Sequence, residues 1–96
     1  MLYTFSKSHY DYDELTSLLQ HLSEDDILLF WLDGVLLPLK YPKLFKQLNH
    51  LQLTLNLDVQ ARNLSKLLQQ KTPQIEQISI EKCVDISAQY FPQVAY

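Results

Sequence analysis

Glycine and cysteine are almost absent from this chain, which has one of each among its 96 residues. Phosphate-binding loops and dinucleotide fingerprints need several glycines, because backbone N–H groups must approach the phosphate closely, so a lone Gly34 argues against both. A lone Cys83 cannot form an internal disulfide. Runs of basic residues are also missing. With 8 Lys and Arg and a net charge of −3, we do not expect this chain alone to bind RNA or DNA directly.

Long apolar runs are missing as well. No stretch approaches the roughly eighteen residues that a membrane span needs. The opening residues MLYTFSKSHY show neither the basic start nor the long apolar centre of a signal peptide. We therefore expect a cytoplasmic protein without a membrane segment. A hydrophobic fraction of 47% is sufficient for a core, and the length suits a single domain over residues 1–96.

Apolar residues switch repeatedly between strand-like and helix-like spacing. The predicted strands are 2–5, 26–32, 51–58 and 75–80, and helical spacing covers 15–22, 41–48, 59–68 and 81–91, with Pro92 ending the last helix. After Asp26 the run 26–32 is continuously apolar, which is typical of a strand covered on both faces. Alternating strands and helices predict a three-layer α/β/α fold, flavodoxin-like or Rossmann-like, with a mainly parallel sheet of about four to five strands.

The strand predicted at 51–58 has an unusual polar face. Leucines alternate there with Gln52, Thr54 and Asn56, and successive strand residues point to opposite faces. We therefore expect one face of this strand to meet something polar or wet, and a partner that completes a thinly covered sheet is one possibility. In the following helix, Asp58 is expected as the N-cap. Asn63 is expected to break that helix, since Asn tolerates positive φ.

The loop after the first strand contains the residues that most resemble a catalytic or metal site. His9, Asp11 and Asp13 could approach a metal ion, but no second cysteine or nearby histidine supports such a site. Asp11 followed by Glu14 fits a helix cap better. A Ser6, His9, Asp33 triad can be assembled only on paper, because no nucleophile-elbow motif surrounds the serine. We expect neither a metal nor a cofactor.

Cys83 is the one thiol that could handle sulfur. In the helix 81–91 it shares an apolar stripe, typical of a core-facing position, with Ile80, Val84, Ser87, Ala88 and Phe91. Burial raises a thiol pKa, whereas a nearby helix N-terminus and the neighbouring Lys82 would lower it. Packing is the favoured interpretation, and a reactive thiol stays open as the alternative.

Four stretches together resemble the TusB/DsrH family of small sulfur-relay subunits. They are MLYTFSKS (1–8), LLFWLDGV (28–35), LNLDVQARNL (55–64) and QVAY (93–96), and the resemblance covers essentially the whole chain. The family more often has Pro at the position of His9, Gly at that of Asn63 and Trp near that of Tyr96. The last two exchanges keep a residue that tolerates positive φ and an aromatic anchor, respectively.

The resemblance implies a non-catalytic subunit with no activity of its own. TusB-like chains assemble with TusC-like and TusD-like paralogues into a heterohexamer. This complex passes persulfide sulfur through a TusE-like carrier toward the enzyme that makes 2-thiouridine at the tRNA wobble position, so tRNA contact would be indirect. The sulfur-bearing cysteine belongs to the TusD-like subunit, and no residue here matches it. Two alternatives stay open: a persulfide carrier using Cys83, and a DsrEFH-type subunit in dissimilatory sulfur metabolism.

The predicted partner-binding residues are Asp33, Gly34, Asp58 and Arg62. All four follow predicted strand ends, where parallel sheets meet ligands and partners. A purely structural interpretation is open for each: a turn at Asp33 and Gly34, a helix cap at Asp58, and an ion pair at Arg62.

Overall fold

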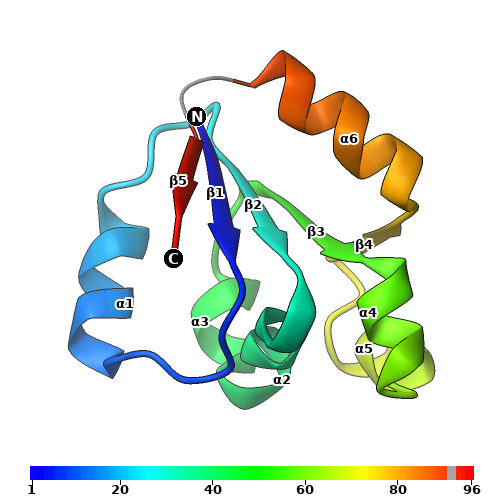
Figure 1. Ribbon diagram of the computed structural model, residues 1–96. Coiled ribbons are helices and arrows are strands. Elements are labelled where there is room, and N and C mark those ends of the chain that lie inside the picture. The colour runs from blue at the N-terminus through cyan, green and yellow to red at the C-terminus, as the bar shows by residue number, and fades with distance from the viewer. Residues whose placement is uncertain (91–92) are drawn as a thin grey trace.

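The protein forms one parallel sheet flanked by helices, as a computed structural model that describes residues 1–90 and 93–96 shows (Figure 1). The strands are β1 (Leu2–Phe5), β2 (Ile27–Phe30), β3 (Leu51–Leu55), β4 (Glu76–Ile78) and β5 (Gln93–Ala95). The helices are α1 (Tyr12–Gln20), the 3-10 helix η1 (Leu32–Leu36), α2 (Leu37–Lys40), α3 (Pro42–Lys46), α4 (Asn56–Ala61), α5 (Ser65–Lys71) and α6 (Ile80–Gln89). The predicted three-layer α/β/α fold with a parallel sheet is confirmed.

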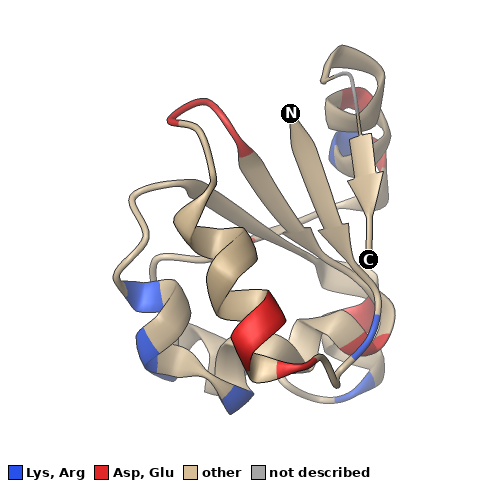
Figure 2. Cartoon of the chain, turned by 90° about the vertical axis from the view of Figure 1, so that its left-hand side faces the viewer, with Lys and Arg blue, Asp and Glu red and all other residues tan. Residues whose placement is uncertain are grey.

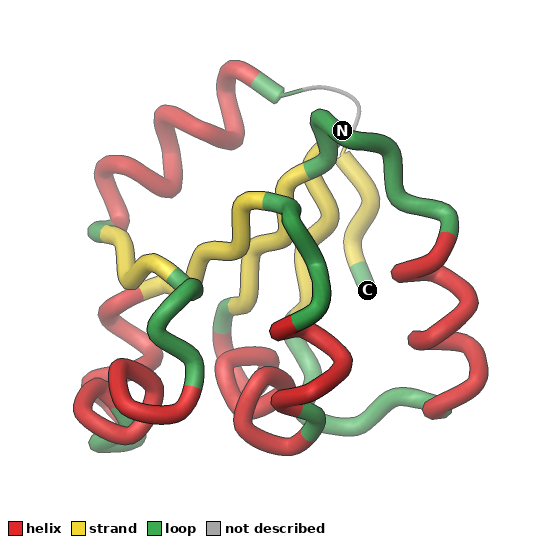
Figure 3. The backbone as a smooth tube through the Cα atoms, turned by 180° about the vertical axis from the view of Figure 1, so that it is seen from behind, coloured by secondary structure: helices red, strands yellow, loops and turns green. Residues whose placement is uncertain are grey.

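The strand order is β4-β3-β2-β1-β5, and every neighbouring pair is parallel. From β1 to β4 the chain therefore moves steadily toward one edge of the sheet, and α6 then returns it to the other side of β1. Helices α1 to α5 lie on one face, whereas α6 lies alone on the opposite face (Figure 3). The order reverses between β1 and β5, and such a switch point is where parallel sheets usually receive ligands.

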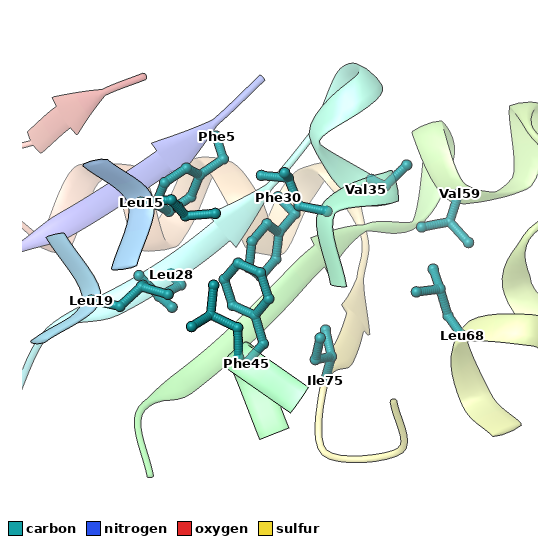
Figure 4. Packing of buried hydrophobic residues seen from close by; sticks show 12 residues of the cluster. Phe5, Leu15, Leu19, Leu28, Phe30, Val35, Phe45, Val59, Leu68 and Ile75 are labelled. Atoms are coloured by element: carbon teal, nitrogen blue, oxygen red, sulfur yellow. The ribbon is translucent and has the colours of Figure 1, made fainter. Parts of the chain in front are cut away.

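Aromatic rings fill the larger core, between the sheet and helices α1 to α5. Phe30 lies between Phe5 and Phe45, with ring centroids 5.5 Å and 5.1 Å away (Figure 4). All three side chains are fully buried. Leucines from α1, α2 and α5 close around them, including Leu15, Leu19, Leu37 and Leu68. Every residue of β2 is buried: Leu28 and Phe30 face this core, whereas Ile27 and Leu29 face the opposite side of the sheet.

A smaller core lies under α6. Its buried residues are Leu2, Ile27, Leu29, Leu53 and Ile78, and the α6 residues packed on them are Cys83, Ile86 and Tyr90. No residue of α6 is itself fully buried. This face of the sheet is therefore the thinly covered one.

The polar face of β3 is buried within the chain, so it meets a polar group, as one alternative predicted, and not water or a partner. Gln52 and Thr54 are 1% and 0% exposed. The Gln52 amide Nε2 donates to the Phe45 backbone carbonyl at 2.9 Å, which joins β3 to the end of α3. Buried polar groups are accommodated when they find such partners. On the other face of β3, Leu51 is 48% exposed.

The helix boundaries follow local chemistry. Asp11 caps α1, its Oδ1 accepting from the Glu14 N–H at 3.0 Å, as predicted. Pro42 occupies the first turn of α3, where a missing N–H costs nothing. Asn63 has φ 55° and separates α4 from α5, which confirms the predicted break. Ser79 caps α6, and its Oγ accepts from the Lys82 N–H.

Several predicted elements are longer than the observed ones. Strands 26–32, 51–58 and 75–80 shorten to 27–30, 51–55 and 76–78, and the helix 81–91 becomes 80–89. The chain turns as soon as the sheet ends: η1 follows β2 after Trp31, and α4 follows β3 directly. The predicted stop at Pro92 lies outside the described residues. Within the described chain, no helix is long and apolar enough to cross a membrane.

Candidate functional site

Arg62 gathers the charged residues that the sequence singled out at the ends of β2 and β3. Its Nη2 lies 2.7 Å and its Nε 3.2 Å from Oδ1 of Asp33. Its Nη1 donates to the Asp58 backbone carbonyl at 3.1 Å and lies 3.8 Å from the Asp58 carboxylate. Asp33, Asp58 and Arg62 therefore form one cluster, although they come from η1 and α4.

Asp58 is not the N-cap of a helix, so that prediction was wrong. Helix α4 starts at Asn56, because β3 ends at Leu55, and Asp58 lies inside its first turn. Its carboxylate Oδ2 accepts from the Leu32 N–H at 2.7 Å. Asp58 thus ties α4 to η1 and still lies where a helix macrodipole favours a negative charge.

Leu32 is held in a backbone conformation that side chains rarely adopt, with φ 52°. Such a residue costs of order 1–2 kcal/mol and persists only where surrounding contacts enforce it. The hydrogen bond to Asp58 is one such contact. The side chains of Leu32 and its neighbour Trp31 are 43% and 37% exposed. The Leu57 side chain, next to Asp58 in the sequence, is 63% exposed.

These residues form what we call the strand-end surface: Trp31, Leu32, Asp33, Leu57, Asp58 and Arg62. It combines exposed apolar side chains with the charged cluster of Asp33, Asp58 and Arg62. Aromatic and arginine side chains of this kind are enriched where proteins bind one another. Sequence reasoning found the charged members and missed Trp31, Leu32 and Leu57. The sequence signal that could have found them is that apolar residues continue beyond the ends of β2 and β3.

Gly34 has a structural reason to be glycine. A Cβ atom there would lie 1.9 Å from the Phe5 carbonyl oxygen, so a side chain cannot fit without displacing β1. Gly34 closes the turn after β2, its N–H donating to the Trp31 carbonyl at 2.9 Å. Of the four predicted partner-binding residues, this one is buried and positions the others.

The loop after β1 does not assemble the triad considered from the sequence. The Ser6 Oγ donates to the Tyr96 carbonyl at 3.0 Å. His9 Nδ1 lies 3.0 Å from the Lys40 ammonium, and Asp33 is bound to Arg62. Each member therefore has a different partner. Among residues 1–90 and 93–96, no three His, Cys, Asp or Glu side chains are grouped to hold a metal ion.

Cys83 faces the smaller core and is half-buried. Burial raises the pKa of its thiol above the ordinary value; a Ser87 hydrogen bond opposes this, and the nearby Asp58 carboxylate adds to the rise. The thiolate, which is the nucleophilic form, is therefore disfavoured. The predicted stripe was partly wrong, because Ile80 and Val84 are 47% and 60% exposed, and Phe91 lies outside the described residues. Ile86 and Tyr90 share the core-facing side with Cys83 instead.

Comparison with known proteins places this arrangement in a family. The family described as DsrH like protein matches residues 7–93. An uncharacterized protein of Haemophilus influenzae (strain ATCC 51907 / DSM 11121 / KW20 / Rd) is 43% identical over 95 residues, which cover 99% of each chain.

Proposed function

This chain belongs to the DsrH-like protein family, and we propose that it is a non-catalytic subunit of a TusBCD-like heterohexamer. Membership in this family supports a role related to sulfur relay. In this proposal the complex acts in the cytoplasm and relays persulfide sulfur for 2-thiolation of the tRNA wobble uridine. TusC-like and TusD-like paralogues are the direct partners. A TusE-like carrier receives the sulfur, and tRNA is reached only indirectly.

The position of Cys83 is the observation that carries the non-catalytic role. It is the only cysteine in the chain, it packs against the smaller core, and its pKa is raised by burial and by Asp58. A persulfide carrier needs an accessible thiolate to attack the donor sulfur, usually beside a base or another positive group. Burial of Cys83, the main cause of its raised pKa, has the opposite effect. The sulfur-bearing thiol then belongs to a partner.

The strand-end surface supports the partner-binding half of the proposal. Its exposed apolar side chains could be covered by a paralogue, and the Asp33 carboxylate, with its side chain 62% exposed, could exchange Arg62 for a basic residue of that paralogue. Strain at Leu32 is consistent with a position kept for contact, since strained residues concentrate at functional sites. Partner binding by Asp33, Asp58 and Arg62 remains a prediction.

The decisive test measures wobble-uridine 2-thiolation in cells that lack this gene and carry either the wild-type chain or Cys83→Ser. Both should restore thiolation to the same level at equal protein abundance. If only the wild-type chain restores it, Cys83 carries sulfur and the non-catalytic role fails. If deletion leaves thiolation unchanged, the tRNA pathway fails, and the DsrEFH-type alternative would have to be tested through sulfur oxidation.

A second experiment tests directly which subunit carries the sulfur. The purified complex is incubated with a cysteine desulfurase and cysteine, and intact masses of all subunits are measured. We expect one added sulfur on a partner subunit and none on this chain. A sulfur adduct on Cys83 that is chased by a TusE-like acceptor would establish the carrier alternative.

A further inference from the structure

A hollow of about 490 Å³ opens at the switch point of the sheet, between α1 and the ends of β1 and β5. It is separate from the strand-end surface, which lies beyond β2 and β3. The fully buried ring of Phe5 and the ring of Tyr96, which is 38% exposed, both line it. Its volume is within the range of sites that bind small groups or side chains.

Aromatic rings define the chemistry of this hollow. The rings of Phe5 and Tyr96 are nearly parallel, at 13° with centroids 5.5 Å apart, and Tyr10 meets Phe5 edge-on at 86° and 5.9 Å. The face of an aromatic ring carries negative electrostatic potential and attracts cations, and Tyr96, unlike the fully buried Phe5, is accessible to one.

Two carboxylates reinforce this preference for a positive charge. Asp13 and Glu14 line the same hollow from the first turn of α1, and both are exposed. Neither forms a salt bridge with any residue in the described part of the chain. In Figure 2 the acidic first turn of α1 and the acidic loop before β2 lie at opposite ends of the molecule. A guanidinium or ammonium group fits this hollow both in size and in charge.

The neighbouring strand β5 has a free edge that could hold an extended chain. Tyr96 directs both of its backbone groups at β1, since its N–H donates to the Thr4 carbonyl at 2.8 Å and its carbonyl accepts from the Ser6 N–H at 3.2 Å. Strand residues alternate in direction, so the backbone groups of Ala95 and Gln93 point outward. The sheet order ends at β5, which leaves them available for another strand.

We propose that an extended basic segment of a partner protein adds to the outer edge of β5 and places an Arg or Lys side chain in the hollow, between the Tyr96 ring and the carboxylates of Asp13 and Glu14. Backbone hydrogen bonds to Gln93 and Ala95 would supply affinity, and the hollow would select the basic side chain. The proposal does not depend on the sulfur-relay function, because it uses a different part of the molecule.

The test titrates the full chain with three probes and follows backbone amides by NMR. The probes are acetyl-Val-Arg-Val-Arg-Val-amide, the same peptide with citrulline at both arginines, and acetyl-arginine amide. Citrulline keeps the shape of arginine without its charge. We expect the arginine peptide to bind about tenfold more tightly than either other probe, with the largest shifts at Gln93, Ala95 and Tyr96.

Matched variants locate the charge effect. Asp13→Asn with Glu14→Gln should reduce binding of the arginine peptide to the level of the citrulline peptide. Asp25→Asn with Glu24→Gln, which changes net charge equally in the distant loop before β2, should leave binding unchanged. Equal binding of the arginine and citrulline peptides, equal loss in both double variants, or shifts away from β5 would overturn the proposal. If acetyl-arginine amide binds as tightly as the peptide, the strand-addition step is wrong.

Discussion

Arg62 binds Asp33 across the ends of two neighbouring strands, with two guanidinium nitrogens 2.7 Å and 3.2 Å from one carboxylate oxygen. The Asp33 side chain is 62% exposed and that of Arg62 is 28%, so water screens the pair and a partner can reach it. Exposed ion pairs usually contribute about 0–1 kcal/mol to stability. We therefore expect this ion pair to matter more for contact with a partner than for the stability of the fold.

Replacing Arg62 should separate binding from stability. We expect Arg62→Ala to lower the free energy of unfolding by less than about 1 kcal/mol and to weaken assembly with TusC-like and TusD-like paralogues at least tenfold. Lys82→Ala is the matched control, because it removes another exposed ion pair, 3.1 Å from Glu76. Urea denaturation and size-exclusion chromatography measure the two effects. Unimpaired assembly of Arg62→Ala would remove this residue from the proposed interface.

Leu32→Gly should make the chain slightly more stable while weakening partner binding. Glycine adopts the φ of 52° without the roughly 1–2 kcal/mol of side-chain strain. Its greater entropy in the unfolded chain opposes this gain by about 0.5–1 kcal/mol. A net gain of about 0.5 kcal/mol is expected in urea denaturation. Leu57→Ala, on the same surface with helical backbone, should show no gain. A destabilised Leu32→Gly chain would mean that the exposed leucine packs within the monomer.

Gly34→Ala should be the most damaging small change on this side of the molecule. The added methyl group would meet the Phe5 carbonyl oxygen at 1.9 Å, so β1 or η1 must move. We expect the free energy of unfolding to fall by about 1–3 kcal/mol, as for other overpacked sites. Asp33→Ala, one residue earlier and exposed, should cost less than about 1 kcal/mol. Equal, small effects for the two variants would show that the turn is easily displaced.

Cys83 should titrate at higher pH in the folded protein than in the unfolded chain. Burial and the Asp58 carboxylate raise its pKa, which favours the protonated thiol in the folded state. This contribution to stability is complete below the unfolded pKa and is lost as pH rises through the folded pKa. The pH midpoint of iodoacetamide alkylation, with and without urea, measures the difference. A lower midpoint in the folded chain would indicate a stabilised thiolate and favour the carrier alternative.

Local chemistry explains which features could be predicted from residues near one another in the sequence. The run ILLF is apolar at every position because β2 is covered on both faces, and Asp11 caps α1 through a neighbour three residues away. Asn63 breaks a helix because it adopts positive φ more readily than most residues. Each of these outcomes depends on an interaction within about one helical turn or one strand.

Two of the wrong predictions depended on contacts between distant segments. Asp58 is a residue type that often caps helices, but α4 begins two residues before it and its carboxylate accepts from the Leu32 N–H of η1. Gln52 is polar in a half-polar strand, yet it is buried and its Nε2 donates to the distant carbonyl of Phe45. Nothing in the alternating pattern of residues 51–58 distinguishes a polar face that meets water from one that meets a backbone carbonyl.

By itself the sequence determined the α/β class, the parallel sheet, and the set of charged residues at strand ends. Four short stretches also indicated the family to which the chain belongs. Periodicity and capping encode these features locally. The tertiary structure alone decided that Asp33, Asp58 and Arg62 form one cluster, that Cys83 packs against the smaller core, and that Tyr96, after β5, lines a hollow beside α1. These depend on which strands become neighbours, and strand order is set by packing of the whole chain and not by any single segment.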